Sequence, residues 1–274
     1  MGRPGCAPRL WRVIETTVDV PHIRALVGES ALWRDIRHVP TTGSTNADLS
    51  AAAHRGEPAG QVLLASEQTA GRGRLTRQWA SPAGSSISMS VLLAPTQPAA
   101  RWGWLSLLTG VAVADALDEL ARPGVRVAVK WPNDVLVDGG KVCGILSERV
   151  EHPAGVRAVV GLGVNLTLTR DELPVPTATS LALAGFETTV DDVVAGILRH
   201  LERHHRAWEH AGTLRDAYRA RCASIGAPLT ITAPGRGPIG GTGHDVDDEG
   251  CLQVRTAAGI ETFAVGDVVH ARLA

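Results

Sequence analysis

Apolar and polar residues alternate along the chain in two patterns, one typical of strands and the other typical of helices. Between residues 86 and 91, apolar residues and serines alternate with period two, which predicts a strand with one packed face. From residue 102 to residue 120, apolar residues recur at helical spacing and stop before Pro123-Gly124, which predicts a long buried helix. Segments of both kinds follow one another from Ile36 onward. The pattern therefore predicts a domain of the α/β or α+β class.

The same criteria predict further elements on either side of these two. Short strands are expected at residues 62–65, 125–131, 135–137, 142–146 and 156–164, and helices at 19–32, 47–53, 190–210 and up to about 221. Ser44 or Thr45 is the expected N-cap of the helix that follows Asn46. Asp138-Gly139-Gly140 separates two of the strands with residues that tolerate positive φ, so a hairpin is expected there.

The pattern of apolar and polar residues changes after Ile225-Gly226. Short strand-like runs at 229–232, 251–254 and 261–265 are separated by turns rich in Gly, Pro and Asp. Runs of this length and spacing predict a small all-β barrel of about 50 residues at the end of the chain.

Composition and charge exclude several classes of function. A chain of 274 residues with 44% hydrophobic residues, 20% charged residues and a mean hydropathy of +0.05 is typical of a globular protein. Its apolar runs are far shorter than the ~20 residues that cross a bilayer, and its start lacks the features of a secretion signal, so a cytoplasmic protein without a membrane partner is expected. The net charge of -1 removes the overall positive field of non-specific nucleic-acid binders, so an anion site must be local.

Cysteine and histidine spacing gives no sign of a metal site. The cysteines are far apart and form no CxxC pair, so reduced and mostly buried thiols are expected for Cys6, Cys143, Cys222 and Cys251. His200 and His204 lie one helical turn apart, but Leu201 stands where a zinc-protease helix has Glu. A solvated helix face is therefore expected for the two histidines.

Cationic residues gather at predicted loops and strand ends. The segment Gly71-Arg72-Gly73-Arg74 directly follows a predicted strand, and its glycines let the backbone approach a ligand closely. Lys130 ends a strand that Pro132 stops, Lys141 follows a glycine-rich turn, and Arg77 adds a fifth cation. A carboxylate brought to about 4 Å from a phosphate charge is repelled by ~4 kcal/mol at an effective dielectric near 20. Five converging cations offset such repulsion, so a polyanionic substrate is predicted.

Two common nucleotide-binding fingerprints are not matched. A dinucleotide fingerprint needs glycine where Thr76 stands, and Gly140-Lys141 lacks both the preceding glycine and the following Ser or Thr of a phosphate-binding loop. Taken alone, the Gly-Arg loop is more typical of a mobile solvated turn than of a ligand site. Gly161 and Gly163 fall within a predicted strand, where glycine weakens packing unless another segment or a ligand comes close.

Five segments, in this order along the chain, resemble the biotin protein ligases: Gly43-Ser44-Thr45-Asn46 and the residues 68–79, 130–134, 140–146 and 161–165. The similarity extends from about Thr41 to Arg221, and the predicted C-terminal barrel resembles the SH3-like domain of the same family. The resemblance implies an α+β fold, with helices packed on a central mixed β-sheet as in class II synthetases. It also implies an N-terminal segment at 1–36, a catalytic domain at 37–222 and an SH3-like domain at 223–274.

The resemblance further implies an ATP-dependent ligase, EC 6.3.4.15. Such an enzyme makes biotinyl-5′-AMP from biotin and MgATP, then transfers biotin to one lysine of a biotin carboxyl carrier domain. The segment before Ile36 is too short for a winged helix-turn-helix, so the single-function branch without specific DNA binding is expected. A lipoate or octanoate ligase or transferase, thought to share this architecture, and an Arg-Gly nucleic-acid-binding module are the alternatives.

Residues that match the family's motifs take their expected roles from it. Contacts to biotin are expected from Ser44, Thr45, Asn46, Gln68, Gly71, Arg72, Gly73, Arg74 and Lys141. Contacts to the nucleotide are expected from Arg74, Arg77, Trp79, Lys130, Asn133 and Asn165. Lys141, Arg72 and Arg74 are expected to act in catalysis, with Lys141 between the carboxylate and the α-phosphate. Leu75-Thr76 replaces the expected Arg-Gly, so the order of the loop without ligand stays open, as do the metal ligands and the base for the acceptor lysine.

Overall fold

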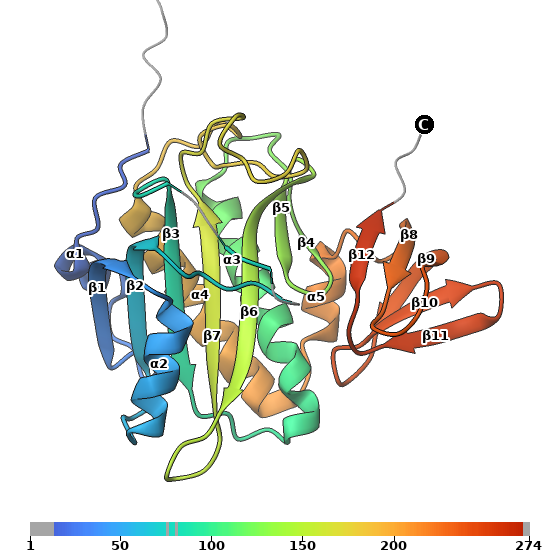
Figure 1. Ribbon diagram of the computed structural model, residues 1–274, viewed down its shortest axis with the longest axis horizontal. Coiled ribbons are helices and arrows are strands. Elements are labelled where there is room, and N and C mark those ends of the chain that lie inside the picture. The colour runs from blue at the N-terminus through green and yellow to red at the C-terminus, as the bar shows by residue number, and fades with distance from the viewer. Residues whose placement is uncertain (1–13, 75–76, 80–81, 271–274) are drawn as a thin grey trace, which may run out of the picture.

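The computed structural model contains a seven-stranded and a five-stranded β-sheet, built from consecutive parts of the chain (Figure 1). It describes residues 14–74, 77–79 and 82–270. The strands of the larger sheet are β1 Asp35–Thr42, β2 Gln61–Gln68, β3 Ser86–Leu93, β4 Val127–Lys130, β5 Asp134–Val137, β6 Gly140–Val150 and β7 Arg157–Asn165. Their order is β1-β2-β3-β7-β6-β5-β4, with β1 and β2 parallel and all other neighbours antiparallel. The expected central mixed sheet is confirmed.

Helices cover both faces of the larger sheet. They are α1 Val20–Val27, α2 Thr45–His54, the 3-10 helix η1 Ala99–Gly103, α3 Trp104–Leu120, α4 Val190–Ala211 and α5 Arg215–Arg221. Alternate residues of β2 reach opposite faces, because Val62 and Leu64 pack in the core that contains α3 and α4, whereas Leu63 packs with Leu49 of α2. In Figure 1, α2 lies in front of the sheet and α4 behind it.

Strand β3 is buried on both faces, so the expectation of one packed face is wrong. Ser88 and Ser90 are buried, as are the apolar residues Ile87, Met89 and Val91 beside them. The serine face is covered by α2, which packs on β3, and the Ser90 hydroxyl donates to Thr45 Oγ1 or Asn46 Oδ1 of α2. The polar residues of this strand therefore face polar groups of the protein, and they do not indicate a solvent-exposed face.

Most predicted elements of this part are confirmed, with shifted ends. Ser44 is the N-cap of α2, and its hydroxyl accepts a hydrogen bond from the Ala47 amide. The predicted hairpin joins β5 to β6, with positive φ at both Asp138 and Gly139. Helix α1 is shorter than expected because the chain leaves it at Gly28, which has a φ of 72°.

The five-stranded sheet is antiparallel and has the order β11-β10-β9-β8-β12. Its strands are β8 Pro228–Thr232, β9 Ile239–Val246, β10 Leu252–Thr256, β11 Gly259–Phe263 and β12 Asp267–His270. Three of the five were predicted, whereas β9 and β12 were missed. The pattern of β9 is hidden by Gly240, Gly241 and Gly243, a residue type that is rare in strands.

Two indole groups of the larger part hold the turn between β9 and β10. Trp104 Nε1 donates to the carbonyl of Asp248 at 2.8 Å, and Trp131 Nε1 donates to the carbonyl of Gly250 at 3.1 Å. Both rings are fully buried. Arg215 of α5 adds an ion pair to Asp245 of β9. The smaller sheet is thus fixed against the larger one by hydrogen bonds that are sheltered from water.

His200 and His204 do not form a solvated helix face, so that expectation is wrong. Their exposed fractions are 6% and 8%, because α4 packs closely against α3 and turns both rings toward Asp115 of that helix. Period analysis places the two histidines on one face of a helix, but it cannot show that another helix covers this face.

The cysteines of the described residues are free thiols, as expected. Cys143 and Cys222 are buried and Cys251 is half-buried, whereas Cys6 lies outside the described residues. Across residues 14–74, 77–79 and 82–270, no helix has the length and apolar character needed to cross a bilayer. In the described part of the N-terminal segment, residues 14–34, the one helix is α1.

Replacing Gly243 by Ala should destabilise the packing of β9 against the segment that leads into β8. A Cβ atom at Gly243 would lie 1.8 Å from the carbonyl oxygen of Ser224, whereas a Cβ at Gly240 of the same strand meets nothing within 4 Å. Gly243→Ala should therefore lower the free energy of unfolding by about 2 to 3 kcal/mol, as overpacking does, and Gly240→Ala by less than about 1 kcal/mol. Urea denaturation of both variants measures this difference, and equal losses would contradict it.

Candidate active site

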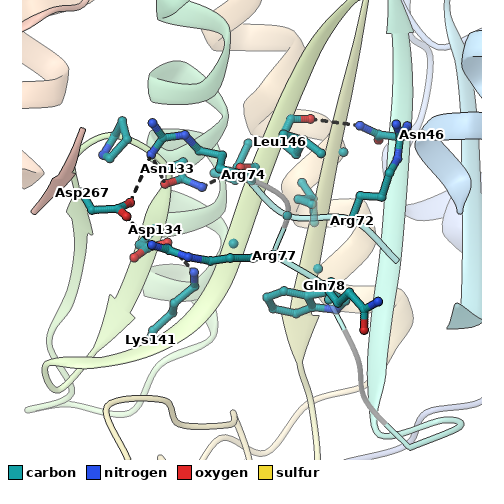
Figure 2. Close-up of a pocket in the computed structure, with 18 of the residues that line it drawn as sticks. Asn46, Arg72, Arg74, Arg77, Gln78, Asn133, Asp134, Lys141, Leu146 and Asp267 are labelled. Atoms are coloured by element: carbon teal, nitrogen blue, oxygen red, sulfur yellow. Dashed lines mark hydrogen bonds and ion pairs between the residues drawn. The ribbon is translucent and has the colours of Figure 1, made fainter. Parts of the chain in front are cut away.

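A cavity of about 290 Å³ lies over strands β4 to β7 and is bounded by the start of α2, the loop after β2 and strand β12 (Figure 2). Twelve of the residues predicted from the sequence line it: Ser44, Thr45, Asn46, Gln68, Arg72, Gly73, Arg74, Arg77, Trp79, Lys130, Asn133 and Lys141. Segments that are distant in the sequence thus meet in one place. The Gly-Arg segment faces this cavity, which argues against a freely solvated turn.

Polar groups at the start of α2 form one end of the cavity. The amide and the hydroxyl of Thr45 donate to Gln68 Oε1 at 2.8 and 3.1 Å. Ser90 on β3 donates to Thr45 Oγ1 at 2.7 Å or to Asn46 Oδ1 at 2.6 Å. These contacts fix the side chains before any ligand arrives and leave them lining the cavity.

Glycines in β6 and β7 make room for side chains that lie flat on the sheet. A Cβ at Gly161 would lie 2.0 Å from Asn46 Oδ1, and a Cβ at Gly163 would lie 2.4 Å from the Trp79 ring. Gly144 of β6 also lies under Trp79, where a Cβ would be 3.1 Å away. The strand glycines therefore allow a close approach, as their position in the sequence suggested, and the groups that approach are Asn46 and Trp79.

The only two lysines in the sequence lie in this cavity and share one carboxylate. Lys141 Nζ lies 2.6 Å from Asp134 Oδ1, and Lys130 Nζ lies 3.2 Å from Asp134 Oδ2. Asp134 begins β5, which lies between β4, whose last residue is Lys130, and β6, whose second residue is Lys141. Antiparallel pairing of three short strands thus brings together residues that are up to eleven positions apart.

The loop arginines are held by acids and carbonyls around the cavity. Arg72 pairs with Glu148 of β6 at 3.0 Å. Arg74 donates to the carbonyl of Gly266 at 3.2 Å and lies 3.9 Å from Asp267, which also pairs with Arg77 (Figure 2). Burial lowers the pKa of the Arg74 guanidinium, and the Asp267 carboxylate partly offsets this shift.

The cavity carries an excess of positive charge. Five cationic side chains line it, together with the two carboxylates Asp134 and Asp267. Trp79 Nε1 is buried there without a hydrogen-bond acceptor within the part of the chain that the structure describes. An anionic ligand with polar groups is the kind of molecule that matches this lining.

Two predicted residues lie elsewhere. Asn165 does not line the cavity, and its amide donates to the carbonyl of Thr179 at 2.9 Å. Gly71 lies beside the cavity, at a position where a Cβ would be 2.3 Å from the carbonyl oxygen of Trp79. Leu75-Thr76, where the sequence departs from the family pattern, lies outside the described residues.

Sequence reasoning missed Asp267 and Glu148. Asp267 belongs to β12, whose four residues give too short a pattern to predict, so no local signal placed it at the cavity. Glu148 had such a signal, because it follows Gly144 and Leu146 at the period of two that places residues on one strand face. Its carboxylate accepts from both Arg72 and Asn46.

Comparison with known proteins agrees with this geometry. The model of the biotin/lipoate A/B protein ligase family matches residues 39–165, and that of the biotin protein ligase C-terminal domain matches residues 224–271. The biotin–[acetyl-CoA-carboxylase] ligase of Mycobacterium tuberculosis is 41% identical over 90% of this chain and 93% of its own length. This chain belongs to the biotin protein ligase family. The bifunctional ligase/repressor BirA of Bacillus subtilis is 31% identical over 89% of this chain and 74% of its own length.

Solved structures of biotin protein ligases share the fold. The protein from Aquifex aeolicus, solved in complex with biotin and ATP, has a TM-score of 0.73 at 24% identity and covers 88% of this chain and 100% of its own. The protein from Leishmania major, solved with biotinyl-5-AMP, has a TM-score of 0.56 and covers 84% of this chain and 98% of its own. The α+β catalytic fold with a small SH3-like β-sheet is confirmed.

Cys143 should resist alkylation in the native protein. It lies in β6 between Lys141 and Gly144, and burial raises the pKa of its thiol to about 12, so about one molecule in ten thousand carries a thiolate near pH 8. Mass spectrometry after iodoacetamide treatment should find Cys143 unmodified until denaturant is added. Cys251, which is half-buried and has a pKa raised to about 11, should react sooner. Rapid native modification of Cys143 would show that β6 is not packed as described.

Proposed function

We propose that this chain is a biotin–[biotin carboxyl-carrier protein] ligase and that the cavity binds biotin and ATP. Adenylation and transfer would both occur there, in a catalytic domain at 37–222 that is completed by Asp267 of a C-terminal domain at 223–274. The observation that carries the proposal is the meeting of five cations with the polar end of α2 in one cavity. A triphosphate and a carboxylate need the cations, and a buried ureido ring needs the polar groups.

Biotin fits best with its ring at the start of α2. Thr45, Asn46 and Gln68 present fixed donors and acceptors there, and the Trp79 ring supplies an apolar surface over Gly163. The carboxylate end would then point toward Lys141. Ser44 reaches the same end of the cavity.

The first step joins the biotin carboxylate to the α-phosphorus of ATP. A carboxylate oxygen forms the new P–O bond, the bond to the β-phosphate oxygen breaks, and pyrophosphate leaves with the electron pair. Lys141 stabilises charge on the carboxylate and the α-phosphate, and Lys130 and Arg77 contact the other phosphates. The lysines exchange Asp134 for substrate oxygens, so charge is neutralised both before and after binding.

Magnesium is expected to enter with ATP. The cavity offers oxygen atoms from Asn133 and Asp134, which suit a hard cation that also binds phosphate and water. A bound Mg²⁺ would neutralise charge on the phosphates. These two side chains are the ones we propose to hold it.

The second step transfers biotin to a carrier lysine. The ε-amine attacks the acyl carbon, the C–O bond to phosphate breaks, and AMP leaves while the amine loses a proton to solvent. Arg72 and Arg74 would cover the mixed anhydride and keep water out, as closing loops do. The acceptor is a biotin carboxyl carrier domain.

Isothermal titration separates this function from its alternative. Biotin should bind, and binding should become much tighter with ATP and Mg²⁺, with pyrophosphate released. Octanoate or lipoate binding in place of biotin would instead support a lipoate or octanoate ligase or transferase. A mass increase of one biotin on a carrier domain would establish the transfer step.

Fluorescence anisotropy with duplex DNA tests the expected lack of specific DNA binding. It should show only weak binding that disappears near physiological salt.

Lys141→Ala should lower adenylation strongly. Loss of a charge that stabilises the transition state costs roughly a hundredfold in rate, and pyrophosphate release measures it. Arg149→Ala is the control, because Arg149 is an exposed cation of the same strand. A Lys141 variant within threefold of the native rate, or an equal loss in the Arg149 variant, would refute the assigned role.

Arg74→Gly should loosen the hold on the intermediate while adenylation continues. Arg74 is the most buried of the three loop arginines. Its loss therefore removes the side chain that is best placed to shield the mixed anhydride from water. Biotin labelling of a lysine-rich bystander protein should rise, and carrier labelling should weaken without disappearing. Arg236→Gly, an arginine of the five-stranded part that pairs with Glu261, is the control. Bystander labelling no higher than that of the native enzyme would assign retention to another residue.

A further inference from the structure

A cluster of one carboxylate and two imidazoles lies between helices α3 and α4, and none of its members lines the cavity. Asp115 belongs to α3, and His200 and His204 belong to successive turns of α4. One ligand atom from each of the three lies within 4.8 Å of the other two. The two reaction steps of the proposed function, adenylation and transfer, involve none of these three residues.

The hydrogen bonds around the cluster leave one imidazole nitrogen without a partner. His200 Nε2 lies 2.8 Å from Glu119 Oε1, so this nitrogen carries the proton that the carboxylate accepts. His200 Nδ1 is then unprotonated and lies 3.7 Å from Asp115 Oδ2. Both atoms are hydrogen-bond acceptors, so neither can donate to the other. Within the described residues, this buried Nδ1 has no hydrogen-bond partner, although the side chain is 94% buried.

We propose that Asp115, His200 and His204 form a binding site for a divalent transition-metal ion, with Zn²⁺ as its ligand. The donor set of two imidazoles and one carboxylate is typical of zinc and less suited to Mg²⁺ or Ca²⁺. Tetrahedral zinc at ~2.05 Å from each donor needs donor atoms roughly 3.3 Å apart. The observed separations from Asp115 Oδ2 are 2.7 Å for His204 Nε2 and 3.7 Å for His200 Nδ1, which lie on either side of this value.

Glu119 completes the arrangement as an orienting group. A carboxylate that accepts from the second nitrogen of a ligating histidine fixes its tautomer and raises its basicity. Burial also lowers the pKa of His200, which favours the neutral imidazole that a metal ion needs. Water would occupy the fourth position, since three protein ligands are present.

Neighbouring arginines compete with the ion and limit its affinity. Arg221 Nε lies 2.6 Å from Asp115 Oδ1. The metal ion would bind the other oxygen, Oδ2, so Arg221 can keep this contact. Arg203 Nη2 lies 2.7 Å from Oδ2 and must turn away, which its exposed side chain can do. The remaining charged neighbours are Asp118, which pairs with Arg221, and Arg199, which pairs with Glu119. A micromolar dissociation constant is therefore expected.

Titration of the full-length, tag-free protein with Zn²⁺ tests the site. One ion should bind per chain, and at a hundred times the dissociation constant the midpoint of thermal unfolding should rise by about 5 °C. Co²⁺ in place of Zn²⁺ should give the intense visible absorption of tetrahedral coordination. Biotin and ATP are absent from these measurements, so failure of the site leaves the proposed function untouched.

Variants locate the bound ion. His204→Gln should weaken binding at least about tenfold, since it removes a ligand but retains a donor to Asp115. His205→Gln is the matched control, because it removes an equally buried histidine of the same helix whose acidic partner is Glu209. Arg203→Gln should tighten binding several-fold by removing the competing cation. This gain in affinity is a result that binding to surface histidines would not produce.

Three outcomes would overturn the proposal. One is a native protein that gives no tetrahedral Co²⁺ absorption. Another is equal weakening by His204→Gln and His205→Gln. The third is binding that Arg203→Gln leaves unchanged. Should His204→Gln fail to fold, the Co²⁺ spectrum of the native protein and the Arg203 variant still decide the question.

Discussion

The structure around the cavity depends on keeping five cations close together in a chain whose net charge is -1. Two unit charges about 4 Å apart at an effective dielectric near 20 repel each other by ~4 kcal/mol, so cations cannot converge without acids between them. Asp134 lies between the two lysines, Asp267 between Arg74 and Arg77, and Glu148 beside Arg72. Each acid belongs to a strand, Asp134 and Glu148 in the larger sheet and Asp267 in the smaller one, so both sheets support the charges.

Asp267 gives the five-stranded sheet a part in the cavity. Strand β12 is an edge strand of this sheet and pairs with β8 alone. Its first residue binds two arginines of a loop nearly two hundred positions earlier in the sequence. The indole groups of Trp104 and Trp131 hold the neighbouring turn, so the carboxylate is placed by packing as well as by charge. The smaller sheet therefore affects the loop directly.

Local signals in the sequence were enough to select twelve residues that line the cavity and to predict most strands and helices. The hairpin before Lys141 could be predicted because Asp138-Gly139-Gly140 tolerates positive φ, and the structure has positive φ at Asp138 and Gly139. Long-range contacts gave no such signal. The covering of the β3 serines, the burial of His200 and His204 and the position of Asp267 all depend on elements that are far away in sequence. A periodic pattern assigns a face to a residue, but only tertiary packing decides what covers that face.

The distribution of side-chain amines is consistent with the proposed chemistry. An acyl adenylate reacts with any free amine that reaches it, and guanidinium groups are far poorer nucleophiles than amines. Of the 27 Lys and Arg residues, the two lysines are both in the cavity and both paired with Asp134, and all others are arginines. The arginines therefore supply positive charge without adding an amine that the acyl adenylate could modify. The two side-chain amines are the ones placed where a substrate carboxylate and phosphate need a compact positive charge.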